Sequence, residues 1–137
     1  MTLGIFTAMT AELLPVGLLT PAAADLAARV LLGIAIGGQY ASDASGAPVP
    51  ADFAAQVELS LVNLKRALEG VGLGLEHVVR LGSHIVDHDL AKLEALGEGL
   101  HAHFGERLPA QTLSGVAALA LPGMLFEIDA VAVRPAA

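Results

Sequence analysis

The chain has 137 residues, of which 55% are hydrophobic and only 15% charged. This length fits one domain with a single core, and few charges with many apolar residues exclude intrinsic disorder. The longest apolar-plus-glycine run, 30–38, is far shorter than the roughly 20 residues that a membrane-spanning helix needs. The mean hydropathy of +0.68 predicts more apolar surface than a small monomer can bury, and therefore an oligomer.

Charge and cysteine content exclude further classes. Seven Lys and Arg against fourteen Asp and Glu give a net charge of −7. Nucleic-acid binding needs clustered basic residues, and Lys65-Arg66 is the one adjacent basic pair, so we predict no nucleic-acid partner. The absence of cysteine excludes disulfides and Cys-bound metals. The start of the sequence lacks the basic stretch that opens a signal peptide, so a cytoplasmic protein is expected.

The first half of the chain predicts one strand and one helix. Residues 1–28 are small and apolar, are interrupted by prolines, and indicate no clear element. The aliphatic stretch 29–37 stops at Gly37-Gly38 and predicts a buried strand. Asp52 is a suitable N-cap for a helix that ends at Gly70. The apolar residues of this helix recur at helical spacing: Phe53, Val57, Leu61, Leu64 and Leu68.

The second half predicts a strand, a helix and two more strands. Residues 78–86 have the pattern of a core strand. Asp89 is a candidate cap for a second helix, which Gly105 ends. The apolar stripe expected for this helix consists of Leu90, Leu93, Leu100 and Phe104. Strands are predicted at 112–121 and 125–133, joined by a short turn at Pro122-Gly123.

These elements predict an α+β domain in which two helices pack on one face of a mixed sheet, with one or two further strands near the N-terminus. In the last strand, Glu127 and Asp129 alternate with apolar residues and so share the face opposite Phe126 and Ile128. Two helices can cover only one face. Because the other face also carries aliphatic side chains, we expect it to pack against other subunits.

Metal and cofactor sites find little support. His84 and His88 could form a metal cluster with Asp87 and Asp89, but their positions on a strand and at the corner after it separate them, which favours ordinary histidines. The glycine-rich stretch at 70–74 follows a helix rather than opening one, so it is not a phosphate-binding loop. We expect no metal and no cofactor.

Several short motifs follow one another in a specific order. Gly37-Gly38-Gln39 ends a strand, and a Pro-x-Asp-Phe-x-x-Gln motif then opens the first helix, with Asn63-Leu64 further along it. Later come Leu108-Pro109-Ala110-Gln111-Thr112 and a last strand that starts at Phe126-Glu127. In this order, and over roughly residues 29–134, the chain resembles the RidA family, also called YjgF or endoribonuclease L-PSP-like proteins.

The resemblance implies a single chorismate-mutase-like domain spanning 1–137, with a six-stranded mixed sheet and two helices on one face. It also implies a homotrimer whose sheets line the centre, with a small-molecule cleft at each subunit interface. Active members of the family hydrolyse enamines and imines such as 2-aminoacrylate to a keto acid and ammonia. A bidentate arginine suits the substrate carboxylate in that reaction, and a carboxylate opposite it can orient the attacking water.

Several positions that bind ligand in the family differ here. The family's Pro-Ala-Arg-Ser/Thr motif has Gln111 in place of its arginine, which removes the charge that would hold a carboxylate. Glu127 matches the family's glutamate in the last strand. The family's tyrosine, the serine of its Ser-Gly-Gln strand end and its helix asparagine correspond to Ala24, Gly37 and Glu94.

Each candidate residue also has a structural interpretation. Gln111 either contacts the ligand or caps or bridges strand ends at the trimer interface. Glu127 either acts in the site or faces solvent. Arg107 is a solvated loop residue or supplies the missing charge. Gly37 and Gly38 allow close backbone approach at a strand end and, by the resemblance, lie beside the ligand.

Two functions stay open at this point. One is hydrolytic deamination of an imine-like substrate, with Glu127 orienting water and Gln111, Gly37, Gly38 and Arg107 lining the site. The other is a non-catalytic trimer that binds a metabolite or a partner. The acidic charge and the lack of a basic groove argue against ribonuclease activity.

Overall fold

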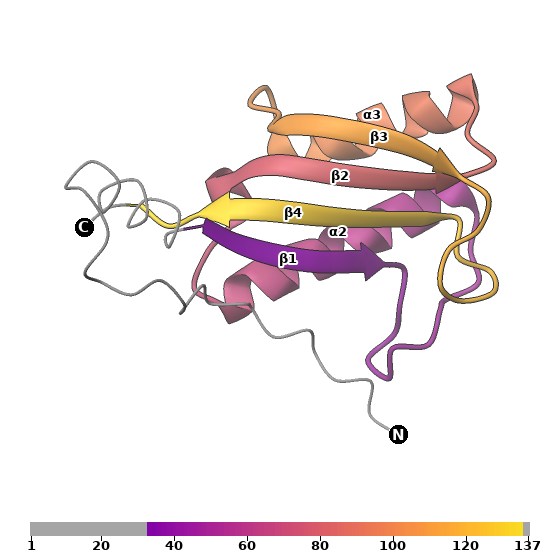
Figure 1. Cartoon of the computed structure of the whole chain (residues 1–137), viewed down its shortest axis with the longest axis horizontal. Helices are drawn as coiled ribbons and strands as arrows, with labels where there is room; N and C mark the ends of the chain where they lie inside the picture. Colours follow the sequence, from indigo (N-terminus) through magenta and orange to yellow (C-terminus); the bar gives the residue numbers. More distant parts are fainter. Residues whose placement is uncertain (1–32, 136–137) are drawn as a thin grey trace, which may run out of the picture.

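Strands and helices follow the order that the sequence predicts over residues 33–135, which are the part of the chain that this computed structural model describes. Both helices lie behind one face of the sheet (Figure 1), so the α+β class is confirmed. The elements in chain order are β1 (Gly33–Tyr40), α2 (Phe53–Gly70), the 3-10 turn η1 (Leu75–His77), β2 (Val78–Val86), α3 (Leu90–Phe104), β3 (Ala110–Val116) and β4 (Phe126–Val133).

The sheet of the described residues has four strands in the order β1-β4-β2-β3, not the six that the resemblance implies. The further strands expected near the N-terminus, and the start of the first strand at 29–32, lie outside the described residues. β4 is antiparallel to both β1 and β2, whereas β2 and β3 are parallel, so the sheet is mixed as predicted. Among the described residues no helix is long and apolar enough to cross a membrane.

The connection between the last two strands differs from the prediction. β2 lies between β3 and β4, so the turn at Pro122-Gly123 does not join neighbouring strands. β3 ends at Val116 rather than at residue 121, because the chain must pass the end of β2 before it can pair on the far side. Residues 117–125 form that passage, and Gly123 adopts a φ of 85° within it.

α2 forms as its sequence predicts and supplies one wall of the core. The Asp52 carboxylate accepts a hydrogen bond from the Ala55 backbone N at 2.8 Å, which confirms the N-cap. Phe53 packs edge-on against the Phe126 ring, with 5.9 Å between the ring centroids. The fully buried side chains of α2 and β4 that face each other across the core are Val57, Leu61, Leu64, Leu68, Phe126 and Ile128.

Two amides of α2 anchor the loops around β4 and β1. The Gln56 amide donates hydrogen bonds to the carbonyl oxygens of Ala51 and Gly123 and accepts one from the Leu125 backbone N at 2.8 Å. The Asn63 amide donates to the carbonyl oxygen of Tyr40 at 3.0 Å. Both residues belong to the motif that carried the family resemblance, and the structure gives both a scaffolding role.

The apolar stripe predicted for the second helix is partly wrong. Leu90 is 75% exposed and Leu93 43% exposed, whereas Leu96 and Leu100 are buried. Gly99 explains the difference, because a Cβ there would lie 2.8 Å from Cγ1 of Val57. α3 therefore approaches α2 most closely at Gly99, and the residues beside that contact enter the core while the first turn of α3 does not.

This close approach predicts that alanine substitution at two glycines of α3 changes the free energy of unfolding differently. A Cβ added at Gly97 would meet no atom within 4 Å, so Gly97→Ala should raise the free energy of unfolding by about 1 kcal/mol through helix propensity. Gly99→Ala should be less stable than Gly97→Ala by about 1–3 kcal/mol, because Val57 is stiff and its surroundings are packed. Urea denaturation followed by circular dichroism measures both values, and equal stability of the two variants would contradict the packing described here.

Candidate functional site

The face of the sheet opposite the helices carries most of the polar side chains of the strands. On β4, Phe126, Ile128, Ala130 and Ala132 are buried under the helices, and the residues between them point the other way, as the sequence predicts. Among the described residues no helix or strand covers this face (Figure 1). It is called the open face below, and Glu127 and Asp129 both lie on it.

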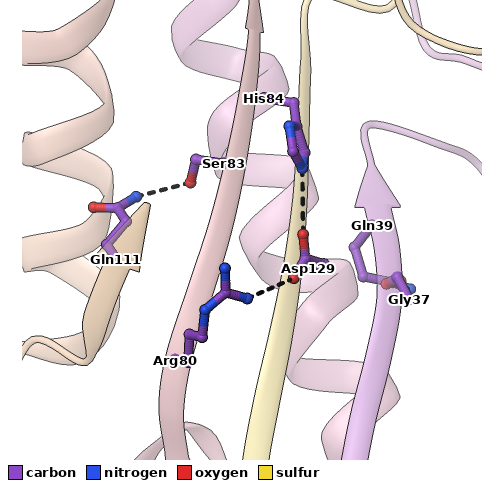
Figure 2. A network of polar contacts seen from close by, with 7 residues as sticks. All are labelled: Gly37, Gln39, Arg80, Ser83, His84, Gln111 and Asp129. Atoms are coloured by element: carbon purple, nitrogen blue, oxygen red, sulfur yellow. Dashed lines mark hydrogen bonds and ion pairs between the residues drawn. The ribbon is translucent and has the colours of Figure 1, made fainter. Parts of the chain in front are cut away.

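Asp129 is held by two side chains of β2 (Figure 2). Its Oδ1 lies 3.8 Å from Nη1 of Arg80, and its Oδ2 lies 3.3 Å from Nε2 of His84. The side chains of Asp129 and His84 are each 34% exposed, so water screens these contacts only in part. A Cβ at Gly82 would overlap the Asp129 carboxylate. The absence of a side chain at Gly82 therefore lets Asp129 lean over β2.

Glu127 leans to the other side of β4. Its carboxylate lies over Gly38 of β1, where an added Cβ would overlap Oε1. Glu127 is level with Tyr40 on β1 and with His84 on β2. Among the described residues, no lysine, arginine or histidine nitrogen forms an ion pair with Glu127 within 4.0 Å. Within residues 33–135, the Asp129 carboxylate is therefore paired with a cation and the Glu127 carboxylate is not.

Gly37 and Gly38 lie within β1 rather than at its end, which corrects the predicted strand boundary. The pairing of β1 with β4 is irregular between Ile36 and Gln39. The Gln39 side-chain amide donates a hydrogen bond to the carbonyl oxygen of Gly37 at 3.0 Å. Such an irregularity changes the direction of successive residues along a strand. It brings Gly38 under Glu127, and β1 then continues to Tyr40.

The loop after β1 is fixed by short polar contacts. The Tyr40 hydroxyl donates to the carbonyl oxygen of Gly46 at 2.6 Å. Hydrogen bonds from the side chain and the backbone of Ser45, followed by one from the backbone of Ala47, lower the pKa of Asp43. These contacts order the loop beside Glu127, and this loop carries the Asp43 carboxylate and no lysine or arginine.

Gln111 lies on the other side of the sheet from Glu127. It is level with Leu81 on β2, and its side-chain amide donates a hydrogen bond to the hydroxyl of buried Ser83 at 2.7 Å (Figure 2). This bond joins β3 to β2 within one chain. Gln111 and Ala130 are both level with Leu81 of β2. Along β4, Ala130 is three residues, or roughly 10 Å, from Glu127. One small ligand cannot contact both residues of the same chain.

Arg107 lies further away still. It lines a groove of about 980 Å³ between the C-terminal ends of the two helices, together with His77, Val78 and Phe104. Val78 is level with Ala132, at the opposite end of β4 from Glu127. Within one chain, Arg107 therefore does not supply a charge beside Glu127. Of the sequence-predicted site residues, the structure brings together Gly38 and Glu127.

No metal centre is formed by the described residues: within 33–135, no group of three or more His, Asp or Glu side chains is placed to hold an ion. His84 is engaged with Asp129, while His88 lies beyond the end of β2 against Gly115. The Arg80–Asp129–His84 contacts were missed in the sequence. The alternation of β4, and of β2 from Arg80 onward, could have placed these side chains on one face. It could not have placed Arg80 and His84 beside Asp129, which depends on the pairing of the two strands.

A family model and a curated relative both match most of this chain. Residues 25–134 match a family described as Endoribonuclease L-PSP. Over 98 residues the chain is 34% identical to the 2-iminobutanoate/2-iminopropanoate deaminase of Escherichia coli K12, a match that covers 71% of this chain and 76% of that protein.

Solved structures of similar proteins share the fold. A protein of unknown function of the conserved Rid family, YyfB from Yersinia pestis, is 38% identical with a TM-score of 0.69, over 74% of this chain and 78% of that one. E. coli TdcF, solved with bound serine, is 27% identical with a TM-score of 0.67, over 75% of this chain and 81% of that one.

The contact between Gly38 and Glu127 predicts a selective effect of one added methyl group. Gly38→Ala should turn the Glu127 carboxylate away from β1 and leave the fold intact, because the overlapping atoms are at the end of a flexible side chain. Gly37→Ala is the matched control, since a Cβ there meets no atom within 4 Å. Crystal structures and melting temperatures of both variants test this. An unmoved Glu127 in Gly38→Ala, or loss of folding in that variant alone, would contradict it.

Proposed function

This chain belongs to the endoribonuclease L-PSP family, the family of RidA, and on that premise we propose that it hydrolyses a small imine or enamine in clefts between the subunits of a homotrimer. Glu127 orients the attacking water, Gly38 makes room for its carboxylate, and Gln111 of a neighbouring subunit contacts the substrate. The complete sheet has the six strands that the family resemblance implies. Homologues named imine deaminases support the reaction class.

The positions of Gln111 and Glu127 support the proposed assembly. The two side chains lie on opposite faces of one sheet, Gln111 on edge strand β3 and Glu127 beside β1. A cleft that uses both must therefore take them from two copies, with the β3 side of one subunit next to the β1 side of another. The open face also carries Ala35 and Val131, which are level with each other on β1 and β4 and which a neighbouring copy would bury.

The molar mass in solution tests the assembly. Sedimentation equilibrium should give three times the chain mass of 13.9 kDa, with no monomer at micromolar concentration, because closed cyclic symmetry buries the open face of every copy. Val131→Lys places a charge on that face and should shift the mass toward monomer. Ala54→Lys, at an exposed position of α2, should leave the mass unchanged. A monomeric wild-type protein would contradict the proposed trimer.

The chemistry requires a carboxylate that is free to act on water. The oxygen of water adds to the imine carbon while one of its protons passes to Glu127 and then to the substrate nitrogen. The resulting amino alcohol collapses to a carbonyl product and releases ammonia. The observation that carries this proposal is the state of Glu127, which lies over a glycine with no ion-pair partner among the described residues. Asp129 beside it is paired with Arg80 and is not available in the same way.

A non-catalytic metabolite-binding trimer is the second candidate. It is favoured because, among the described residues, two polar groups that could hold a substrate carboxylate are already engaged. Gln111 is neutral and bonded to Ser83, and Arg80 is paired with Asp129. Arg107 lines the groove at the helix ends and becomes a ligand residue only if a neighbouring copy approaches that groove. The net charge of −7 argues against the ribonuclease activity in the family's name.

Glu127→Gln distinguishes the two candidates. Imines are generated in situ by an amino-acid oxidase or an amine oxidase, and carbonyl release is followed with semicarbazide as a competing trap. Wild-type protein should accelerate release from at least one imine, and Glu127→Gln should lose at least 100-fold of that rate, because an amide cannot accept the proton from water.

The control for this experiment is Glu58→Gln, which removes the carboxylate of an exposed residue of α2 and should keep the wild-type rate. Equal rates in wild-type protein and Glu127→Gln would assign the activity elsewhere. No acceleration of any imine, together with a melting temperature that small ligands raise, would support the binding trimer instead.

A further inference from the structure

The charges around Glu127 bear on what kind of substrate the site can hold. Its level neighbours are Tyr40 and His84, and the glycine beneath it adds no polar side chain. Arg80, the one lysine or arginine on the described strands, is level with Val131 and is paired with Asp129. A carboxylate in this setting attracts a positive group and repels a negative one, and water screens the effect only in part.

The remaining cations of the described chain are held elsewhere. Lys92 donates hydrogen bonds to the carbonyl oxygens at the end of β2 and lies over the ring of Phe53. Arg107 lies at the groove between the helix ends. The other basic side chains and their partners are Lys65 with Glu69, Arg66 with Asn63, and Arg134 with the carbonyl oxygen of Val71. Within residues 33–135, none of these side chains faces Glu127.

Gln111 brings no charge to the substrate either. Its amide nitrogen is bonded to the hydroxyl of Ser83, which is fully buried and so cannot exchange this partner for water. An uncharged amide in this position contributes a hydrogen bond but not the Coulomb attraction of a bidentate guanidinium. The net charge of −7 further lowers the local concentration of anions near the protein.

From these observations we propose that the substrate of the Glu127 site is a carboxylate-free imine or enamine, of the kind formed when a primary amine is oxidised, bound through its protonated nitrogen. This inference rests on the proposed function and narrows its substrate class. A protonated imine carries its positive charge on the C=N unit, so Glu127 would both hold the nitrogen and stand close to the carbon that water attacks. The relative from E. coli, by its name, acts instead on imino acids, which carry a carboxylate.

Two stable ligands of nearly identical shape test the sign of the charge. Acetamidinium is a planar cation that resembles a protonated imine, and acetate is its anionic counterpart. Isothermal titration calorimetry at equal ionic strength should show acetamidinium binding at least tenfold more tightly than acetate. Glu127→Gln should abolish the preference, because the charged acceptor is lost.

Gln111→Arg should reverse the preference toward acetate and toward pyruvate by about tenfold or more. The matched control is Ala54→Arg, at an exposed position of α2. It adds the same charge away from the site and should keep the wild-type preference. The paired activity measurement compares an amine-derived imine with 2-iminopropanoate, and the wild-type rate enhancement should be larger for the former.

The outcomes separate this inference from the proposed function. Tight acetate binding with acceleration of 2-iminopropanoate would overturn the substrate class and keep the hydrolase. A clear acetamidinium preference without any hydrolysis would keep the ligand class and overturn the hydrolase. Binding of neither ligand would overturn the inference.

Discussion

The arrangement of the open face depends on two glycines that leave room for two carboxylates. β4 presents Glu127 and Asp129 on the same face, two residues apart, where parallel carboxylates would repel each other. A side chain at Gly38 of β1 or at Gly82 of β2 would occupy the space that the Glu127 or the Asp129 carboxylate now fills. Each carboxylate therefore leans over a different neighbouring strand, and the two charges separate without any change in the backbone of β4.

This separation gives the two acids different surroundings. Asp129 leans toward β2 and meets Arg80 and His84, so its charge is compensated and it ties β4 to β2. Glu127 leans toward β1, where the irregular pairing near Gly38 offers space but no cation. Asp129 also engages His84, the imidazole that is level with Glu127 on β2. The structural carboxylate thus keeps the candidate functional carboxylate available.

Local patterns predicted the elements well, and long-range pairing accounts for the errors. The bounds of α2 and β2, the caps Asp52 and Asp89, and the alternation of β4 depend on residues close in sequence, and all are confirmed. Leu90 and Leu93 fit a helical stripe equally well, but the approach at Gly99 decides which residues of α3 enter the core. The length of β3 could not be predicted locally, because it ends where the chain must pass β2.

In the candidate site, too, the features that depend on long-range strand pairing could not be predicted. Glu127 and Gly38 were found from motifs, but which face Gln111 occupies follows from its register with β2. That register makes Gln111 part of the interior hydrogen bonding as well as of the surface. Ser83 is fully buried, and its hydroxyl has the Gln111 amide as a partner. An unpartnered buried hydroxyl costs about 1–3 kcal/mol. An arginine at position 111 would therefore have to replace the hydrogen bond to Ser83 as well as direct its charge to a ligand. The neutral character of this edge is therefore set by a pair of residues, one of them in the core, rather than by a single surface substitution.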